Sequence, residues 1–247
     1  MAFSYLDSFQ GKVIAHRGLV STKFIENSSS AIKFCVENNI PIEIDLQYHK
    51  SDCFFVFHDE DLKRMFGWNN LLNKVPKENI GFLKYKDGTE ILELKNLLSI
   101  VNGKVPLLIE VKVPKGLKVK NIRNIALSLS RFLDGYNGDL AIQSFNPIFL
   151  NCFKRLNLNY PVGQIICNWD NVSNLNKFER IFLKSSIHLL INRVDFINVE
   201  KELLEKNAFK LILKSKLIKV FSWTVKSKHQ KFVQKHQVDA VVGENFT

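Results

Sequence analysis

The stretch PIEIDLQ, residues 41–47, carries the clearest structural pattern in this sequence of 247 residues. Aliphatic residues at its even positions alternate with Glu43, Asp45 and Gln47 at the odd positions. Because successive side chains of a β-strand point to opposite faces, the pattern predicts a strand with one aliphatic and one acidic face. If helices cover the aliphatic face, the carboxylates point into the interior of the fold, where they need a partner or a cation. The alternative is an edge strand whose acidic face meets solvent.

Short apolar runs like this one alternate with longer helical patterns along the chain. The runs that predict strands are residues 12–16, 42–47, 106–112, 140–144, 162–166, 196–199, 219–224 and 239–242. The patterns that predict helices include residues 29–38, 93–101, 121–133, 147–156, 199–215 and 227–236. Repeated βα units favour a parallel sheet, and eight of them in 247 residues predict a closed TIM (β/α)8 barrel. The alternative, a doubly wound open sheet, needs a glycine-rich phosphate loop after its first strand, and HRGLVSTK at residues 16–23 lacks the G-x-G-x-x-G pattern.

One region, residues 60–89, interrupts this rhythm. It is rich in Lys, Asn and Gly and has only short apolar pieces. We interpret it as a small insertion after the second βα unit. No other segment resembles a linker, a repeat or a low-complexity tract, so the sequence predicts a single domain over residues 1–247.

The composition indicates an ordinary folded domain with a basic surface. Apolar residues make up 46% and charged residues 24%, which excludes disordered and fibrous classes. The 35 Lys and Arg residues outnumber the 24 Asp and Glu residues, and the net charge of +11 favours an anionic ligand such as a phosphate, a nucleic acid or a membrane surface. No apolar run approaches the roughly 18 residues of a membrane span. The four cysteines lack the spacing of a metal or redox site, so we expect reduced thiols and a cytoplasmic protein.

A second predicted strand repeats the unusual placement of charge. In PLLIEVKV, residues 106–113, Glu110 and Lys112 share one face of an otherwise apolar run. Together with Glu43 and Asp45, Glu110 gives three carboxylates of the kind that bind Mg²⁺, Ca²⁺ or Mn²⁺, whereas a zinc site usually contains His or Cys. Lys112 would neutralise charge there or hold a substrate anion. The alternative is an internal Glu110–Lys112 ion pair without a metal.

Two histidines, His16 in VIAHRG and His58 in FFVFHDE, end predicted strands. The carboxyl-terminal ends of barrel strands form the rim of the active site. A pair of imidazoles at that rim suits general acid and general base catalysis, since histidine titrates near neutral pH. The alternative for each histidine is a hydrogen-bonded structural role.

Arg17 and Glu26 lie close to the first histidine in the sequence. Arg17 could bind a phosphate through two parallel hydrogen bonds, with Gly18 permitting a tight turn after it. Alternatively, Arg17 is a surface arginine. The segment FIENSSSAIKF predicts a helix start capped by Asn27 or Ser28, which makes Glu26 either an acid of the first turn or part of the site.

Taken in order, several short motifs resemble the glycerophosphodiester phosphodiesterase family, from the first predicted strand to the last. They are HRG at 16–18, ENS at 26–28, EIDLQ at 43–47, HD at 58–59, IEVK at 109–112, QSF at 143–145 and SWTV at 222–225. The resemblance implies a TIM barrel that uses one divalent metal ion. It also implies hydrolysis of glycerophosphodiesters, such as glycerophosphocholine, to sn-glycerol 3-phosphate and an alcohol.

The same resemblance implies roles for individual residues. The metal ligands would be Glu43, Asp45 and Glu110. The general acid and general base would be His16 and His58. The substrate-binding residues would be Arg17 and Lys112 on the phosphate, Glu26 as an anchor of the site, and Trp223 along the glycerol side of the pocket. For Trp223, a place in the barrel core is an equal alternative.

The implied mechanism uses the substrate's own hydroxyl as the nucleophile. One histidine would deprotonate the glycerol 2-hydroxyl, which attacks phosphorus, while the other histidine protonates the leaving alcohol. Water would then open the resulting cyclic phosphate with the two roles exchanged. No Ser or Cys nucleophile is needed in such a reaction.

The sequence departs from the family pattern at three places, one of which is the divergent insertion after His58. ENS replaces the usual ENT, which keeps the capping hydroxyl. The chain carries VVGENFT where family members usually have a Thr-Asp-x-Pro-like closing loop, so the shape of the rim near Glu244 and Asn245 stays open.

Two other functions are alternatives. A phospholipase D-like phosphodiesterase acting on lysophospholipids or sphingolipids would use the same site with a more apolar mouth. The candidates for that mouth are Phe54, Phe55, Phe57, Phe66, Trp68 and Phe82, of which Phe55 and Phe57 are favoured as interior packing. A non-catalytic basic protein binding nucleic acid or a membrane surface would use KSKLIK at 214–219 and KSKHQK at 226–231, whose lysines we expect to solvate helix faces. We therefore expect a small-molecule diester as the partner and no specific nucleic acid.

Overall fold

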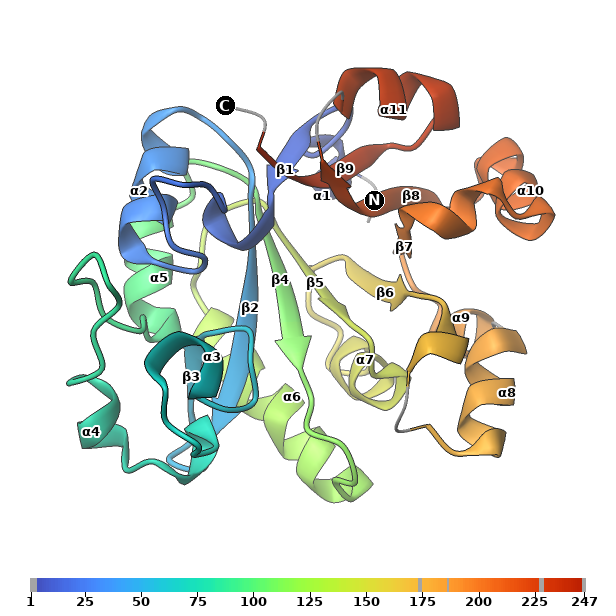
Figure 1. The fold of residues 1–247 in the computed structure, drawn as a ribbon. Helices are drawn as coiled ribbons and strands as arrows, with labels where there is room; N and C mark the ends of the chain where they lie inside the picture. The colour runs from blue at the N-terminus through green and yellow to red at the C-terminus, as the bar shows by residue number, and fades with distance from the viewer. Residues whose placement is uncertain (1–3, 173–174, 186, 227–228, 246–247) are drawn as a thin grey trace.

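The computed structural model describes residues 4–172, 175–185, 187–226 and 229–245, which form a barrel of eight parallel strands with helices around it (Figure 1). The barrel strands are β1 (Val13–Ala15), β2 (Ile42–His49), β4 (Leu107–Lys112), β5 (Leu140–Ser144), β6 (Val162–Ile166), β7 (Phe196–Glu200), β8 (Lys219–Lys226) and β9 (Ala240–Glu244). The strand order is β1-β9-β8-β7-β6-β5-β4-β2, and β1 also pairs with β2, so the sheet closes on itself. The predicted TIM (β/α)8 barrel is confirmed.

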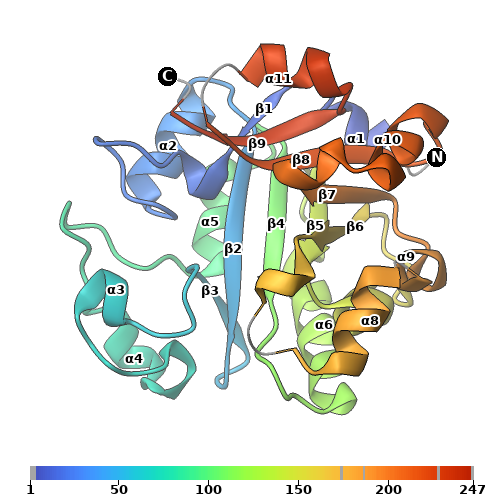
Figure 2. The ribbon, with the colours of Figure 1, turned by 45° about the vertical axis from the view of Figure 1, so that its right-hand side comes forward.

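Helices lie outside the barrel and cover the outer faces of its strands (Figure 2). They are α2 (Ser29–Glu37), α5 (Leu94–Val101), α6 (Val119–Leu133), α7 (Pro147–Lys154), α8 (Lys177–Ser185), α9 (Ile187–Asn192), α10 (Asn207–Ser215) and α11 (His229–His236). On β2, the aliphatic side chains at positions 42, 44 and 46 are buried in the core that joins the barrel to these helices. The acidic face of β2 is thereby turned toward the inside of the barrel, so the edge-strand alternative is wrong.

Some helix boundaries differ from the predicted ones. The helix predicted over 199–215 starts later, because β7 continues to Glu200 and a 3-10 turn (Lys201–Glu205) precedes α10. Of the helix predicted over 227–236, residues 227 and 228 lie outside the described residues. Helices α8 and α9 are not among the predicted helices. Phe178, Ile181 and Phe182 of α8 recur at helical spacing, but they are 84%, 56% and 41% exposed, so this apolar face is not buried against the barrel.

The amino-terminal end of the barrel is closed by apolar side chains. Leu108 and Phe196 fill the interior at this end, and the short helix α1 (Ser4–Asp7) and Phe9 pack into the same cluster. A TIM barrel is a packed core rather than a pore, and its polar site lies at the opposite end. The carboxyl-terminal ends of the strands are therefore where functional side chains can gather.

Strand β3 (Cys53–Val56) does not belong to the closed barrel. It runs antiparallel to β2, with Val56 opposite Leu46 and Cys53 opposite His49, and so leads the chain back toward the barrel. The prediction that His58 ends a barrel strand is wrong for this reason. The β2–β3 hairpin leads the chain back to the barrel rim, where His58 lies.

The insertion over residues 60–89 lies between β3 and α5 and contains α3 (Lys63–Phe66), a 3-10 turn (Leu72–Lys74) and α4 (Lys77–Ile80). It has a small apolar cluster of its own, to which Phe55 and Phe57 contribute buried rings. These two rings pack in the interior, as their alternation favours. Phe54 is also buried, whereas Trp68 is 49% and Phe82 is 79% exposed.

The four cysteines form no disulfide. Cys35 and Cys53 are buried and Cys152 and Cys167 are half-buried, all as free thiols, in agreement with the expectation of reduced cysteines. Among the helices of the described residues, none combines the length and the apolar character that crossing a bilayer requires.

Candidate active site

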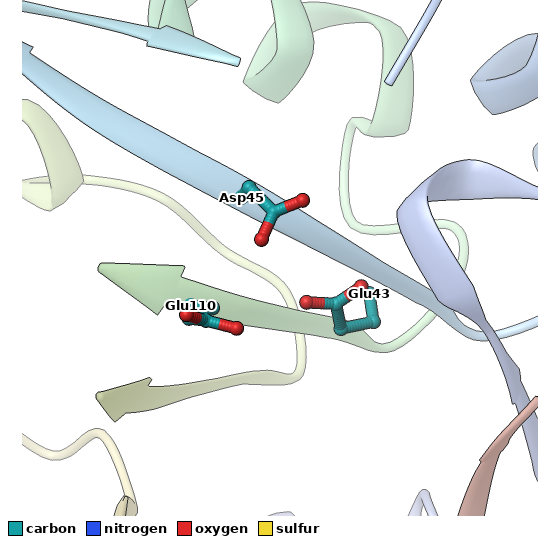
Figure 3. Close-up of side chains that lie close together, drawn as sticks. All are labelled: Glu43, Asp45 and Glu110. Carbon is teal, nitrogen blue, oxygen red and sulfur yellow. The ribbon is translucent and has the colours of Figure 1, made fainter. Parts of the chain in front are cut away.

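Three carboxylates meet at the carboxyl-terminal end of the barrel. Glu43 and Asp45 come from β2 and Glu110 from the neighbouring strand β4, where Glu110 is the register partner of Asp45 (Figure 3). One ligand oxygen from each lies within 4.8 Å of the others, and the three residues are 2%, 1% and 7% exposed. A buried set of carboxylate oxygens is the donor set that hard divalent cations prefer, so these residues fit such an ion.

Positive groups lie directly against this acidic triad. Lys112 Nζ is 2.9 Å from Asp45 Oδ1 and also donates to Glu110, so the predicted alternative of a Glu110–Lys112 ion pair is present, but within a larger network. Arg17 Nε lies 3.4 Å from Asp45 Oδ2, and the backbone N–H of Arg17 donates to Glu43 Oε2 at 2.9 Å. The network distributes its positive charge unevenly over the three acids.

This uneven distribution separates the pKa values of the two acids on β2. Burial raises the pKa of Asp45, but the positive groups Lys112, His58 and Arg17 lower it by more. The pKa of Asp45 is therefore well below the usual range of an aspartate. For Glu43, burial and the charge of Asp45 raise the pKa above its usual range. The acidic face of β2 therefore holds one firmly ionised carboxylate and one that favours a proton or a cation.

His16 directly follows β1 and contacts the last residue of β9. Its Nδ1 lies 2.7 Å from Glu244 Oε1, and the second carboxylate oxygen of Glu244 is 3.4 Å from Lys226 Nζ. Burial lowers the pKa of His16, but the hydrogen bond to Glu244 and the charge of Glu43 raise it more, so the pKa lies above its ordinary value. The hydrogen bond with His16 also lowers the pKa of Glu244 to about 2.

His58 is held in a similar way. Its Nδ1 lies 2.6 Å from Asp59 Oδ1, while Arg64 Nε donates to the other oxygen of Asp59 at 2.6 Å. The Gln47 side chain, on the acidic face of β2, donates to the backbone carbonyls of His58 and Asp59, at 3.0 Å each. These contacts attach the hairpin to the barrel and fix the position of His58 at its rim.

Glu26 joins Arg17 and Arg64. Arg17 Nη1 donates to Glu26 at 3.1 Å, and Arg64 donates to both oxygens of Glu26. Burial raises the pKa of Glu26, but the two arginines lower it more, and the net shift is downward. Of the two alternatives for Glu26, that of a first-turn acid is wrong, because Ser28 caps α2 and the helix begins at residue 29. Arg17 is 17% exposed at its side chain, which also excludes the surface-arginine alternative.

A pocket of about 230 Å³ opens among these groups. Seven of the nine predicted site residues line it, namely His16, Arg17, Glu43, His58, Glu110, Lys112 and Trp223. Asp45 and Glu26 lie behind this lining, where they hold Lys112, Arg17 and Arg64.

The apolar wall of the pocket includes Trp223 of β8, Phe145 directly after β5 and Ile165 of β6. Trp223 donates its Nε1–H to the carbonyl of Asn198 at 3.1 Å, and its ring meets Phe145 edge to face with the centroids 5.7 Å apart. Ile165 completes this wall. Trp223 lines the pocket and also packs against the apolar cluster inside the barrel.

A larger hollow of about 570 Å³ lies at the opposite end of the barrel, among the loops that lead into β4, β5 and β6. Its described lining includes Asp134 and Asp139 and contains no Lys, Arg or His. Without a basic group, that hollow does not suit a phosphate diester. The smaller pocket is the candidate site.

Three polar residues of the site do not stand out as such in the sequence. Glu244 appears there only as a departure from the family's closing loop, Arg64 only as part of the insertion, and Asn27 only within the ENS motif and as a candidate helix cap. Asn27 instead donates to Asp45 Oδ2 at 3.0 Å and adopts a φ of 57°, while Ser28 is the cap. The signal for Asn27 is the acidic strand itself, because buried carboxylates need donors and a nearby amide can supply one.

Comparisons with known proteins agree with this geometry. Among solved structures, a phosphodiesterase from Oleispira antarctica in complex with its product sn-glycerol-3-phosphate has a TM-score of 0.79 and 19% identity, covering 98% of this chain and 94% of that one. A glycerophosphodiester phosphodiesterase from Thermotoga maritima has a TM-score of 0.70 and 23% identity, covering 94% and 93%. One from Parabacteroides distasonis has a TM-score of 0.74 and 17% identity, covering 94% and 92%. At these identities, the likeness shows the fold alone.

A search of curated proteins gave no match. Residues 16–246, however, match the sequence model of the glycerophosphoryl diester phosphodiesterase family, which is nearly the whole chain and includes every predicted site residue. The chain belongs to the glycerophosphoryl diester phosphodiesterase family of enzymes.

Proposed function

We propose that this protein hydrolyses glycerophosphodiesters to sn-glycerol 3-phosphate and an alcohol, with a divalent cation on the acidic triad and histidine acid–base catalysis. One observation supports this proposal above the others: the two histidines, two carboxylates of the triad (Glu43 and Glu110) and two cationic side chains line the same pocket of about 230 Å³. Membership of the family gives the reaction class. The free thiols favour a reducing compartment, the cytoplasm, as the place where it acts.

Glu43, Asp45 and Glu110 would hold the cation, which we expect to be Mg²⁺, Ca²⁺ or Mn²⁺ because all three side chains offer carboxylate oxygens. When bound, such an ion supplies Lewis acidity toward the phosphate oxygens and a fixed orientation for the diester.

The two histidines would move the protons. One imidazole takes the proton of the glycerol 2-hydroxyl as its oxygen bonds to phosphorus, and the other gives a proton to the alcohol oxygen as its bond to phosphorus breaks. The product of this first step is a cyclic phosphate. Water then adds to phosphorus with the roles exchanged, the ring P–O bond breaks, and the 2-hydroxyl regains its proton. Each histidine has its Nδ1 against a carboxylate, which leaves Nε2 for such exchange.

The phosphate would be bound by Arg17 and Lys112, both of which line the pocket. Glu26 would act indirectly, by holding the Arg17 guanidinium at 3.1 Å. Trp223 offers an apolar ring beside the polar edge of the Gln143 and Asn198 side chains, an arrangement suited to the carbon backbone of glycerol.

A second candidate is a lysophospholipid as the substrate, with the same chemistry at phosphorus. Exposed Trp68 and Phe82 favour it, since both belong to the insertion that Arg64 joins to the rim. A lipid substrate predicts hydrolysis of vesicle-presented or long-chain diesters alone. A water-soluble diester needs no detergent.

The decisive experiment is release of glycerol 3-phosphate from glycerophosphocholine by EDTA-stripped protein, with Mg²⁺, Ca²⁺ or Mn²⁺ added back. His16→Ala and Glu43→Ala should each lower the turnover by at least about 10²-fold, while Glu37→Ala, at an exposed position on α2, should leave it unchanged. Turnover that survives both site variants would contradict the site. If the protein hydrolyses lysophospholipid but not glycerophosphocholine, the substrate is a lysophospholipid rather than a water-soluble glycerophosphodiester.

A further inference from the structure

Closure of the barrel brings Glu244 to His16. Strands β9 and β1 are parallel neighbours in which Gly243 is the register partner of Ala15, so the next residue on each strand stands side by side at the rim. Glu244 Oε1 lies 2.7 Å from His16 Nδ1, and both side chains are 15% exposed. A short, mostly buried contact of this kind is a charge-assisted hydrogen bond rather than a passing surface pair.

The contact selects one state of the imidazole ring. An ionised carboxylate has no proton to donate, so Nδ1 of His16 must carry the hydrogen. The other nitrogen, Nε2, is then left with its lone pair, and His16 is part of the lining of the pocket. A neutral histidine free in water prefers the opposite tautomer, with the hydrogen on Nε2. The position of Glu244 therefore decides which nitrogen can exchange a proton with a bound molecule.

The second histidine offers an internal comparison. His58 Nδ1 is 2.6 Å from Asp59 Oδ1, and the remaining oxygen of Asp59 accepts from Arg64. In both pairs the carboxylate stands between an imidazole and a cation, which for Glu244 is Lys226 at 3.4 Å. The two pairs come from distant parts of the chain, yet in each of them a carboxylate contacts Nδ1 of the histidine. This repetition indicates that the carboxylates orient both imidazole rings.

We infer that Glu244 is a positioning residue for His16, which it holds through Nδ1 so that Nε2 faces the substrate. This inference rests on the proposed function, because it gives His16 a proton to exchange. Other charges around His16 cannot fix its tautomer in this way. Glu43 and Asp45 act on it from β2 through their charge, and the Arg17 side chain is engaged by Glu26 and Asp45. A purely structural role, in which Glu244 merely ties the last strand to the first, is the competing explanation.

The tautomer of His16 in the wild-type protein is the first test. Nitrogen NMR of the imidazole ring, in EDTA and at a pH that keeps the ring neutral, should show the hydrogen on Nδ1, with the signal assigned by its loss in His16→Gln. A hydrogen on Nε2 would overturn the inference. This measurement needs no activity, so it separates failure of the inference from failure of the proposed function.

Kinetics of two variants is the second test. Glu244→Ala and Glu244→Gln should lower kcat for glycerophosphocholine by about tenfold or more while KM stays within about twofold, because the variants misplace a proton-transfer group without touching the substrate. Both should also lose the wild-type preference for the Nδ1 tautomer. The matched control is Glu205→Gln, which alters an exposed ion pair with Lys235 and should leave both readouts unchanged.

A structural role predicts a different result. Variants that lose thermal stability but keep the Nδ1 tautomer and the wild-type kcat would overturn the inference. Wild-type protein that shows the Nδ1 tautomer but hydrolyses no diester would contradict the proposed function and leave Glu244 as the group that orients His16.

Discussion

Lys112 Nζ on β4 lies 2.9 Å from Asp45 Oδ1 on the neighbouring strand β2, inside the barrel rim. The lysine also contacts Glu110, two residues before it on β4, and thus bridges two of the three carboxylates. Its side chain is 19% exposed and that of Asp45 1%. In the metal-free protein, this one ammonium group offsets much of the repulsion among the buried acids.

Loss of this ammonium group should destabilise the metal-free protein. Lys112→Met should lower the free energy of unfolding by about 2–4 kcal/mol, because it leaves Asp45 and Glu110 buried without their shared partner. A saturating divalent cation should recover part of that loss, since it would neutralise the same carboxylates. Urea denaturation in EDTA, and again with the cation, measures both effects.

An exposed lysine provides the matched control for this comparison. Lys84 pairs with Glu90, and the two side chains are 50% and 53% exposed. Lys84→Met should therefore change the free energy of unfolding by less than about 1 kcal/mol. Equal effects of the two substitutions would mean that Lys112 does not stabilise the acidic triad.

Asn27 is expected to support the same triad from the loop before α2. Its side chain is 1% exposed, donates to Asp45 Oδ2 at 3.0 Å and accepts from the backbone N–H of Asp45 at 3.3 Å. Asn27→Ala should weaken binding of the divalent cation by about tenfold or more, because Asp45 loses the donor that orients it. Isothermal titration of the stripped protein with Mn²⁺ measures the affinity.

Asn27→Gly separates the lost hydrogen bonds from the backbone effect. Asn27 has a φ of 57°, a conformation that glycine adopts freely and alanine does not. The two variants should bind the cation equally weakly, but Asn27→Ala should be less stable than Asn27→Gly by about 1 kcal/mol. Wild-type cation affinity in both variants would show that Asn27 does not position Asp45.

The acidic triad can be predicted from sequence because it depends on local rules. A strand period of two fixes which side chains share a face, so the alternation in residues 41–47 is enough to place Glu43 and Asp45 together. Glu110 follows from the same rule applied to a second strand. Eight βα units then predict a barrel, whose carboxyl-terminal end collects polar groups.

The groups that hold these residues cannot be predicted in the same way. Glu244 meets His16 across 228 positions of sequence, and the contact exists only because the last strand closes on the first. Arg64 reaches Glu26 from an insertion without any hydrophobic period. His58 reaches the rim on an antiparallel hairpin rather than at the end of a barrel strand. Each of these contacts depends on how elements meet, which a local pattern does not contain.

The contact between Glu244 and His16 should give stability a defined pH dependence. The pKa of Glu244 is lowered from 4.5 to about 2 by its hydrogen bond with His16, so its contribution is present above pH 4.5 and is lost as the pH falls toward 2. Burial lowers the pKa of His16, but Glu244 and Glu43 raise it above 6.5. The contribution of His16 is therefore complete below pH 6.5 and is lost as the pH rises through the folded-state value.

Glu244→Gln should accordingly cost the most stability between pH 4.5 and 6.5, where both groups are charged. The expected loss there is about 1–3 kcal/mol, falling toward alkaline pH. Denaturation in EDTA at a series of pH values measures it. Glu90→Gln, which alters the exposed pair with Lys84, should give a constant difference from wild type across the same range. A difference that is equally flat for Glu244→Gln would show that the two side chains are not coupled.

The ring of Phe196 on β7 packs over Gly163 on β6 and leaves no room for a side chain at that position. A Cβ at position 163 would lie 2.2 Å from Phe196 Cζ, within the packed interior of the barrel. Gly163→Ala should lower the free energy of unfolding by about 1–3 kcal/mol, because the ring must shift. Combined with Phe196→Leu, the loss should be smaller than the sum of the two single losses.

At Gly81 a Cβ would come no closer than 3.9 Å to the Glu78 carbonyl oxygen, so Gly81→Ala is the control. Equal losses at the two glycines would mean that the ring does not pack over Gly163.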